Sequence, residues 1–94
     1  MLQHKIQIIN QLGMHARAAA KLVKTASQFT SHIEIKYNDK IANAKDMLAV
    51  MMLGLSQYSW IELLISGNNT TENKEALSQL QTLINNFFGD KMFI

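Results

Sequence analysis

A histidine and an arginine at the start of an alanine-rich segment are the residues of this chain best placed to do chemistry. Gly13 precedes them, so the sequence predicts a glycine turn that leads into a helix with His15 at its first position. The first turn of a helix presents unpaired backbone N–H groups and the positive end of the dipole, which together favour a bound phosphate. The imidazole of His15 could hold such a group over these donors, and the Arg17 guanidinium suits phosphate oxygens. We therefore predict a phosphate site at His15, Ala16 and Arg17.

The surroundings of the histidine leave a second interpretation open. Alanines at 16, 18, 19 and 20 would keep the site low, so that the active site of a partner could approach closely. Alternatively, His15 is only a tolerable helix cap, because an isolated His-x-Arg pattern is common by chance. His4 and His32 lie in short alternating segments and are expected at the surface. Since the three histidines share no helical or tight-turn spacing, we expect no metal site.

Composition excludes several other classes of function. The 94 residues are 48% hydrophobic and 17% charged, which predicts a single folded domain over residues 1–94. A net charge of +2 without a basic cluster or aromatic platform does not favour a nucleic-acid partner. The chain has no cysteine, no Gly-x-Ser-x-Gly elbow and no nucleotide-binding glycine loop, so we expect neither a hydrolase nor a bound cofactor. The chain has no long apolar run and no signal-peptide pattern. We therefore expect a cytoplasmic location and no membrane partner.

The apolar pattern predicts the order β-α-β-β-α-β-α. Alternating apolar residues predict strands at residues 5–9, 32–37, 40–42 and 60–65. Helical spacing predicts a first helix from His15, a second after Asp46, and a third whose apolar stripe ends with Phe87 near Gly89. Each element has one apolar side, which predicts an α+β open-faced sandwich: a four-stranded antiparallel sheet with three helices on one face. Trp60 would then lie partly exposed on the other face.

Two of these helices carry recognisable ends. Asp46 is the expected N-cap of the second helix, and Gly54 follows its last turn. Asn69 with Glu72 three positions later resembles a capping box, although Thr70 or Thr71 could serve as well.

The second helix is also the expected docking surface. Two turns of helix cannot bury all of its methionines and leucines against one sheet, and exposed methionines adapt well to several partners. We accept Val50 and Leu53 as core. For the others an ordinary core role is the alternative, but we favour exposure, and we predict a docking patch around His15 that consists of Met47, Leu48 and Met51 with Ala16 and Ala20.

Two segments resemble signatures of the HPr family of phosphocarrier proteins. Gly-Met-His-Ala-Arg-Ala-Ala-Ala-Lys-Leu-Val at 13–23 looks like that family's phosphorylation-site signature. Ala-Asn-Ala-Lys-Asp-Met-Leu-Ala-Val-Met-Met-Leu-Gly-Leu at 42–55 resembles its second signature. The order of elements is similar over almost the whole chain, and two signatures at the right separation are far more specific than one.

The resemblance implies a phosphocarrier of the bacterial phosphotransferase system. Enzyme I, charged by phosphoenolpyruvate, would phosphorylate Nδ1 of His15, and the group would pass to a histidine of an EIIA-type protein. Arg17 matches the family's phosphate-neutralising arginine. The chain would be a stoichiometric carrier, not a catalyst, and is expected to be a monomer. The alternative is a regulatory binding module of the same fold that carries no phosphate.

The chain also departs from the family pattern. Ala18 stands where the sugar-transport branch usually has proline, which favours the nitrogen-related branch, often called NPr; residues 42–55 resemble the sugar branch at least as well. Asp46 replaces a serine that is regulatory in some members, so it cannot be phosphorylated. The loop at 68–75 and the tail at 89–94 are longer than usual, and we assign neither a function.

Overall fold

The centre of the molecule is a four-stranded antiparallel sheet. The computed structural model describes residues 1–90. The strands lie in the spatial order β1-β4-β2-β3 and span β1 (Leu2–Gln7), β2 (His32–Tyr37), β3 (Lys40–Asn43) and β4 (Trp60–Ser66). Ile6 lies opposite Ile61 and Ile35 opposite Leu63. Because alternate side chains of a strand point to opposite faces, this register places the apolar residues on one face of the sheet.

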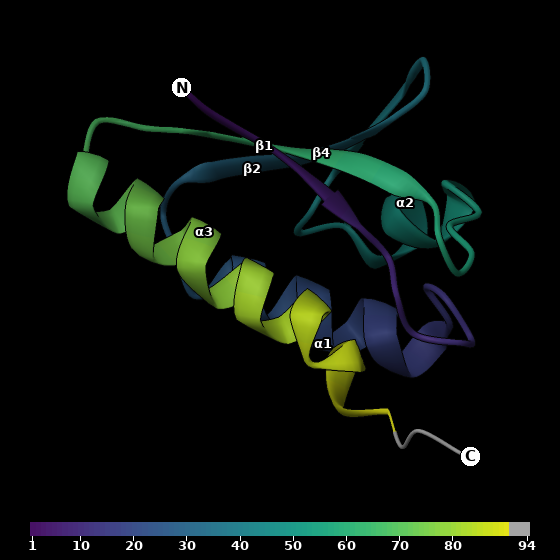
Figure 1. Cartoon of the computed structure of the whole chain (residues 1–94). Helices are drawn as coiled ribbons and strands as arrows, with labels where there is room; N and C mark the ends of the chain where they lie inside the picture. The colour runs from purple at the N-terminus through teal and green to yellow at the C-terminus, as the bar shows by residue number, and fades with distance from the viewer. Residues whose placement is uncertain (91–94) are drawn as a thin grey trace.

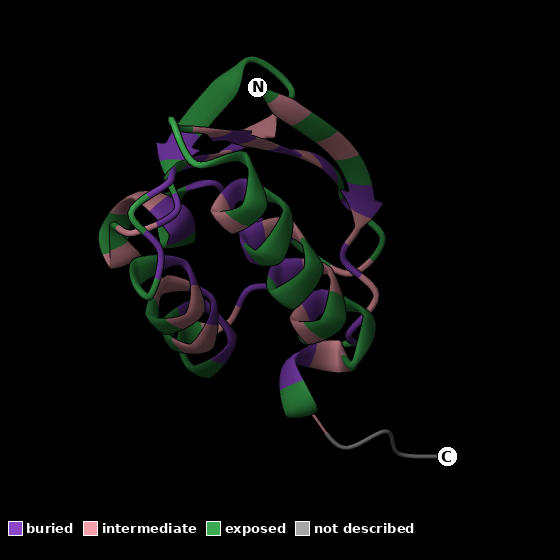
Figure 2. Ribbon diagram, turned by 90° about the vertical axis from the view of Figure 1, so that its left-hand side faces the viewer, coloured by how far each residue is buried: buried purple, intermediate pink, exposed green. Residues whose placement is uncertain are grey.

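The helices all cover that apolar face, as Figures 1 and 2 show. They are α1 (Ala16–Ser27), α2 (Met47–Met52) and α3 (Thr70–Asn85), followed by a 3₁₀ turn, η1 (Phe87–Gly89). The predicted α+β open-faced sandwich and its element order are therefore confirmed. Within residues 1–90, no helix combines the length and apolar character needed to cross a membrane.

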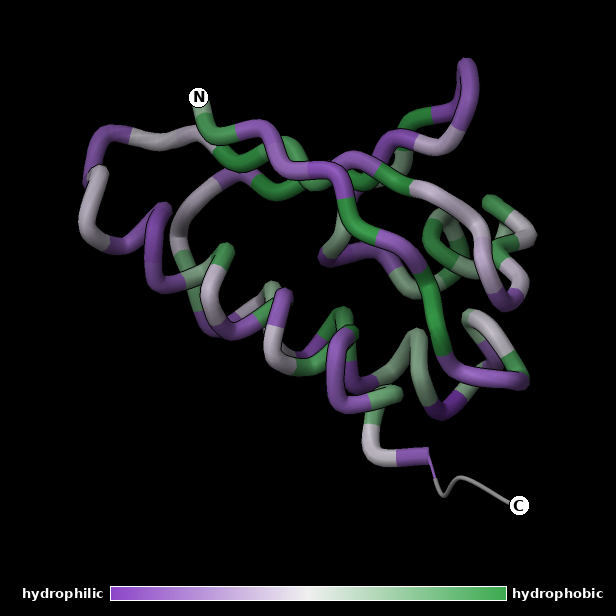
Figure 3. The backbone as a smooth tube through the Cα atoms, viewed as in Figure 1, coloured by the Kyte–Doolittle hydropathy of each residue, from purple (hydrophilic) through white to green (hydrophobic). Residues whose placement is uncertain are grey.

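The core lies between the sheet and the helices. Buried positions follow the inner stripes of the helices in Figure 2, and Figure 3 shows hydrophobic and hydrophilic residues interspersed along the strands. Its largest fully buried apolar side chains include Phe88, Leu22, Leu63, Leu80 and several isoleucines. The other face is open, and Trp60 is 60% exposed there, as predicted.

Several sequence predictions need correction at the ends of elements. The first helix begins at Ala16, not His15, and α3 begins at Thr70, so most of the expected 68–75 loop is helical. Phe88, not Phe87, fills the core, because α3 ends at Asn85 and the two phenylalanines then adopt left-handed φ angles of 59° and 54°. This turn breaks the helical register on which the prediction for Phe87 relied.

Two predictions about side-chain exposure were also wrong in part. His4 lies on the helix-facing side of β1, half-buried, and its Nε2 is 2.8 Å from Nε2 of Gln81 on α3. Ala18 and Ala19 are fully buried against the core, so only Ala16 and Ala20 of the alanine run are open to solvent. Of the tail at 89–94, to which no function was assigned, residues 91–94 lie outside the described residues.

Candidate phosphoryl-acceptor site

His15 caps α1 and presents its ring at the helix N-terminus. The residue has extended backbone angles (φ −69°, ψ 173°), and its carbonyl accepts the first helical hydrogen bond, from Ala19 N–H at 2.9 Å. Its Nδ1 accepts a hydrogen bond from the backbone N–H of Ala18 at 3.3 Å. The side chain is 22% exposed, so a partner can reach it. His15 is therefore a helix cap, as the alternative interpretation held, and the cap places Nδ1 beside the N–H groups of the first turn.

The turn before His15 requires glycine at position 13. Gly13 has φ +63°, and a Cβ there would lie 2.6 Å from the carbonyl oxygen of Leu55 and 2.7 Å from Cα of Ser56. Met14 N–H donates to that same Leu55 carbonyl at 3.0 Å. The backbone of the turn therefore lies directly against the chain that follows α2, and this contact sets the position of His15 as the N-cap of α1.

Asp90, from the far end of the chain, closes the site. Its Oδ2 and Oδ1 lie 2.9 and 3.1 Å from Nε2 of His15. Arg17 Nη2 donates to Oδ1 at 3.1 Å, and Asn10 Nδ2 donates to Oδ2 at 3.0 Å. One carboxylate thus links the histidine and arginine that the sequence predicted to act together, although Arg17 itself is 65% exposed.

These contacts determine which nitrogen of the His15 ring carries the proton. A carboxylate only accepts hydrogen bonds, so Nε2 must be the donor, whereas the N–H of Ala18 requires Nδ1 to be the acceptor. Burial alone would raise the pKa of Asp90, but hydrogen bonds from Asn10, His15 and Arg17 outweigh it and hold that pKa below its usual value. Asp90 therefore stays ionised, and the neutral ring keeps its lone pair on Nδ1.

A buried asparagine supports both the turn and the carboxylate. Asn10 is 1% exposed, and its Nδ2 donates to the Gly13 carbonyl at 2.7 Å as well as to Asp90. The amide must point its nitrogen at these two acceptors, which leaves Asn10 Oδ1 with no hydrogen-bond partner among residues 1–90. The side chain therefore joins the N-terminal loop to the C-terminal turn.

The C-terminal turn is fixed in place by apolar burial and one lysine. Phe88 is fully buried, and Lys21 Nζ donates to its carbonyl at 2.7 Å. The Asp90 N–H donates to the Phe87 carbonyl at 2.8 Å. Left-handed backbone at two consecutive non-glycine residues is unfavourable, so burial of the Phe88 ring must compensate for it. The result is that Asp90 reaches back to the start of α1.

The predicted docking residues lie on α1 and α2, which are in contact beside the site. Leu48 is 70% and Met51 39% exposed, and Ala16 and Ala20 are exposed on α1. Met47 is half-buried and packs against the core, so it is less exposed than predicted. Val50 and Leu53 are buried, as expected, whereas Met52, which was not included in the predicted patch, is 71% exposed. The structure thus gives an exposed apolar surface; its docking role stays a prediction.

Asp46 caps α2 next to this surface. Its Oδ1 accepts a hydrogen bond from Ala49 N–H at 3.1 Å, which confirms the predicted N-cap. Similarly, Asn69 caps α3 by accepting from Glu72 N–H at 2.9 Å, while the Glu72 carboxylate bonds Thr30 rather than completing a capping box. A carboxylate at the start of α2 places a fixed negative charge at the edge of the exposed surface.

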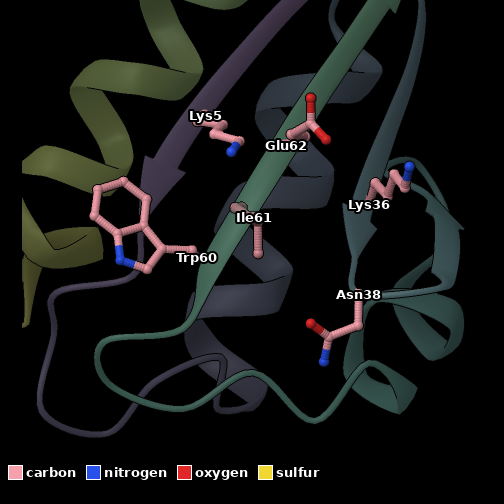
Figure 4. A pocket seen from close by; sticks show the side chains of 6 residues that line it. All are labelled: Lys5, Lys36, Asn38, Trp60, Ile61 and Glu62. Atoms are coloured by element: carbon pink, nitrogen blue, oxygen red, sulfur yellow. The ribbon is translucent and has the colours of Figure 1, made fainter.

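A concave region lies on the open face of the sheet, away from His15. It is a depression of about 270 Å³ lined by the side chains that Figure 4 labels. Glu62 of β4 lies opposite Lys5 of β1 and Lys36 of β2 in the strand register, so charges of opposite sign adjoin one another. Across residues 1–90, no three His, Asp or Glu side chains gather in a way that could hold a metal ion.

Sequence reasoning missed Asn10 and Asp90. Asn10 carried a partial signal, because asparagine three residues before a left-handed glycine is typical of a turn. Asp90 carried none, because 75 positions separate it from His15 and only the fold brings the two together.

Comparison with known proteins connects this geometry to a family. Residues 2–86 match the family described as PTS HPr component phosphorylation site. Phosphocarrier protein HPr of Neisseria meningitidis serogroup A is 42% identical over 90 residues, which cover 96% of this chain and 98% of that protein. HPr of Cupriavidus necator is 40% identical over the same shares of the two chains.

Solved structures of HPr proteins are also similar to this chain. The crystal structure of HPr-C-His from Thermoanaerobacter tengcongensis has a TM-score of 0.89 at 39% identity and covers 98% of this chain and 100% of its own. A structure described as an HPr dimer from the same organism has a TM-score of 0.73 at 40% identity, covering 96% and 100%. With a capping histidine at the start of α1 and similarity over nearly its whole length, this chain belongs to the HPr family of phosphocarrier proteins.

Proposed function

We propose that this protein accepts a phosphoryl group on Nδ1 of His15 from enzyme I and passes it to a histidine of an EIIA-type protein. One observation carries the proposal: the hydrogen bonds of the ring leave the lone pair on Nδ1, at the N-terminus of α1. A nucleophilic nitrogen therefore lies where a phosphate's charge is best stabilised.

The proposed transfer forms one bond to phosphorus and breaks another at each step. The Nδ1 lone pair forms the new N–P bond while the bond between phosphorus and its donor group on enzyme I breaks, and that bond's electron pair stays with enzyme I. Nε2 keeps its proton, so the ring gains a positive charge next to the Asp90 carboxylate. In the second step the lone pair of an EIIA histidine attacks the same phosphorus, and His15 recovers its neutral ring.

Charge on the transferring group is what the remaining residues would stabilise. In phosphoryl transfer, charge is spread over the equatorial oxygens, and catalysis depends on positioning and electrostatics. The first-turn N–H groups of Ala16 and Arg17 and the Arg17 guanidinium are within reach of a group on Nδ1. Because Arg17 is 65% exposed and held by one hydrogen bond, it can turn from Asp90 to the phosphoryl oxygens at little cost.

Intact mass after incubation with phosphoenolpyruvate and enzyme I tests this proposal. We expect one added phosphoryl group, lost in acid, and none in His15→Ala. His32→Ala is the matched control, because His32 is an exposed histidine on β2 whose Nε2 lies 3.3 Å from Oε2 of Glu34. No added mass on the unmodified chain would favour the alternative, a binding module that carries no phosphate; addition to His15→Ala would place the phosphate elsewhere.

We propose the nitrogen-related branch over the sugar-transport branch. The support is Ala18, whose backbone N–H donates to Nδ1, whereas the proline usual in the sugar branch has no N–H to donate. Transfer from the phosphorylated protein to a nitrogen-type EIIA and a sugar-type EIIA, measured side by side, tests this assignment. We expect faster transfer to the nitrogen-type protein; the reverse order would assign the sugar branch.

We further propose that the carrier acts in the cytoplasm as a monomer. Both partners need access to the same histidine, and an exposed site on a single chain provides it. Light scattering coupled to size-exclusion chromatography should give the mass of one chain. A dimer that covers α1 would contradict the shared-access argument.

A further inference from the structure

We propose that Asp90 is a positioning residue that fixes the Nε2–H tautomer of His15 and so directs phosphoryl transfer to Nδ1. This inference rests on the proposed role of His15 as acceptor. Asp90 lies beyond residues 2–86, the part of the chain that matches the family. Its role is therefore carried by contacts within this chain.

The geometry allows the carboxylate only one kind of interaction with the ring. Both oxygens of Asp90 are within 3.1 Å of Nε2. With the proton on Nδ1 instead, the Nε2 lone pair would face a negative carboxylate, and the Nδ1 proton would face the N–H of Ala18. The opposite tautomer is thus disfavoured at both ends of the ring, more strongly at Nε2 because that hydrogen bond is short and charge-assisted.

Asp90 is held before any partner arrives. Its side chain is 9% exposed, and Asn10 and Arg17 each donate to one of its oxygens. Phe88, two residues earlier, is fully buried, and Lys21 holds the Phe88 carbonyl. A carboxylate fixed from several sides keeps its partner ring in one orientation, as in other sites where an acid orients a histidine.

The tautomer can be measured directly on the unphosphorylated protein. At a pH where the ring is neutral, ¹⁵N chemical shifts of His15 should show a bare Nδ1 and a protonated Nε2. Because hydrogen bonds to charged groups are the stronger kind, we expect Asp90→Ala to lower the ratio of the two tautomers about tenfold. Asp90→Asn keeps an acceptor oxygen and should change the ratio less. The nitrogens of His4 and His32 serve as controls within the same spectrum.

The choice of nitrogen can be tested without enzyme I. Phosphoramidate is a small donor: the histidine nitrogen forms the N–P bond while the donor's own P–N bond breaks and ammonia leaves. On the unmodified chain we expect phosphate on Nδ1 of His15, and on Asp90→Ala a mixture with Nε2. Asp39→Ala, in the exposed turn between β2 and β3, is the matched control and should behave like the unmodified chain.

The outcomes separate this inference from the proposed function. An unchanged tautomer ratio in Asp90→Ala, with only Nδ1 phosphorylated, would overturn the role of Asp90 even if enzyme I still phosphorylates His15. A shifted ratio with mixed products would support it even if enzyme I proved not to be the donor. A shift in the His4 and His32 nitrogens as well would show a general structural change and would count against a positioning role.

Discussion

Adding one methyl group at Gly13 tests how the turn before His15 is built. The new Cβ would lie 2.6 and 2.7 Å from backbone atoms of Leu55 and Ser56, which cannot swing away as a side chain can. The left-handed φ of +63° adds about 1–2 kcal/mol for a residue with a Cβ, and overpacking adds about 1–3 kcal/mol. We therefore expect Gly13→Ala to lower the free energy of unfolding by about 2–5 kcal/mol.

Gly54→Ala is the matched control for this prediction. Gly54 has a similar φ of +68°, but a Cβ there would meet no atom within 4 Å. It should lower the free energy of unfolding by only about 1–2 kcal/mol, the cost of the backbone conformation alone. Urea denaturation measures the free energy of unfolding of both variants. The initial rate of phosphorylation by enzyme I should also fall further in Gly13→Ala, because its altered turn displaces His15. If Gly13→Ala were no less stable than Gly54→Ala, the close contact with Leu55 would not matter as we argue.

Three further variants test the site and its surroundings. Arg17→Ala should slow transfer from enzyme I about tenfold or more while leaving the thermal midpoint nearly unchanged, because the guanidinium acts on the transferring charge. Lys24→Ala, exposed on the same helix, should change neither the transfer rate nor the thermal midpoint. Asp46→Ser should change the free energy of unfolding by less than about 0.5 kcal/mol, since serine caps almost as well. It should also raise the affinity for enzyme I, measured by titration calorimetry, because it removes a negative charge. Equal affinities of the two proteins would show that Asp46 is only a helix cap. Met51→Glu should weaken binding of enzyme I and of EIIA by about tenfold or more without unfolding the protein, because Met51 is 39% exposed. Ser78→Glu, at an exposed position of α3, should not weaken binding. Loss of the fold in Met51→Glu would place Met51 in the core.

Local patterns predicted most of the fold because each element has one clear apolar side. The strand at 32–37 and the cap at Asp46 are where the sequence placed them, and of the three candidate caps for the last helix Asn69 is the one that serves. The prediction failed where tertiary packing overrides local periodicity. Phe88 replaces Phe87 in the core because the chain leaves the helix at Asn85 and turns through left-handed conformations, which no spacing rule anticipates.

The site was predictable only in its local part. His15 and Arg17 are two positions apart, and a glycine followed by an alanine run was enough to place them at a helix N-terminus. The carboxylate that sets the tautomer of His15 belongs to Asp90, which follows α3 by five residues. The backbone that packs against Gly13 belongs to Leu55 and Ser56, after α2. Such long-range contacts depend on the whole fold, so they appear only in three dimensions.

The proposed carrier function requires that the phosphoryl group is bonded to Nδ1 of His15. The most direct measurement is ¹⁵N and ³¹P NMR of the protein labelled at histidine, during turnover with phosphoenolpyruvate and enzyme I. We predict a coupling between phosphorus and Nδ1 of His15, with Nε2 still bearing its proton. Phosphorus coupled to Nε2, phosphorus on His4 or His32, or no phosphorus on any histidine would contradict the proposed role of Nδ1 of His15.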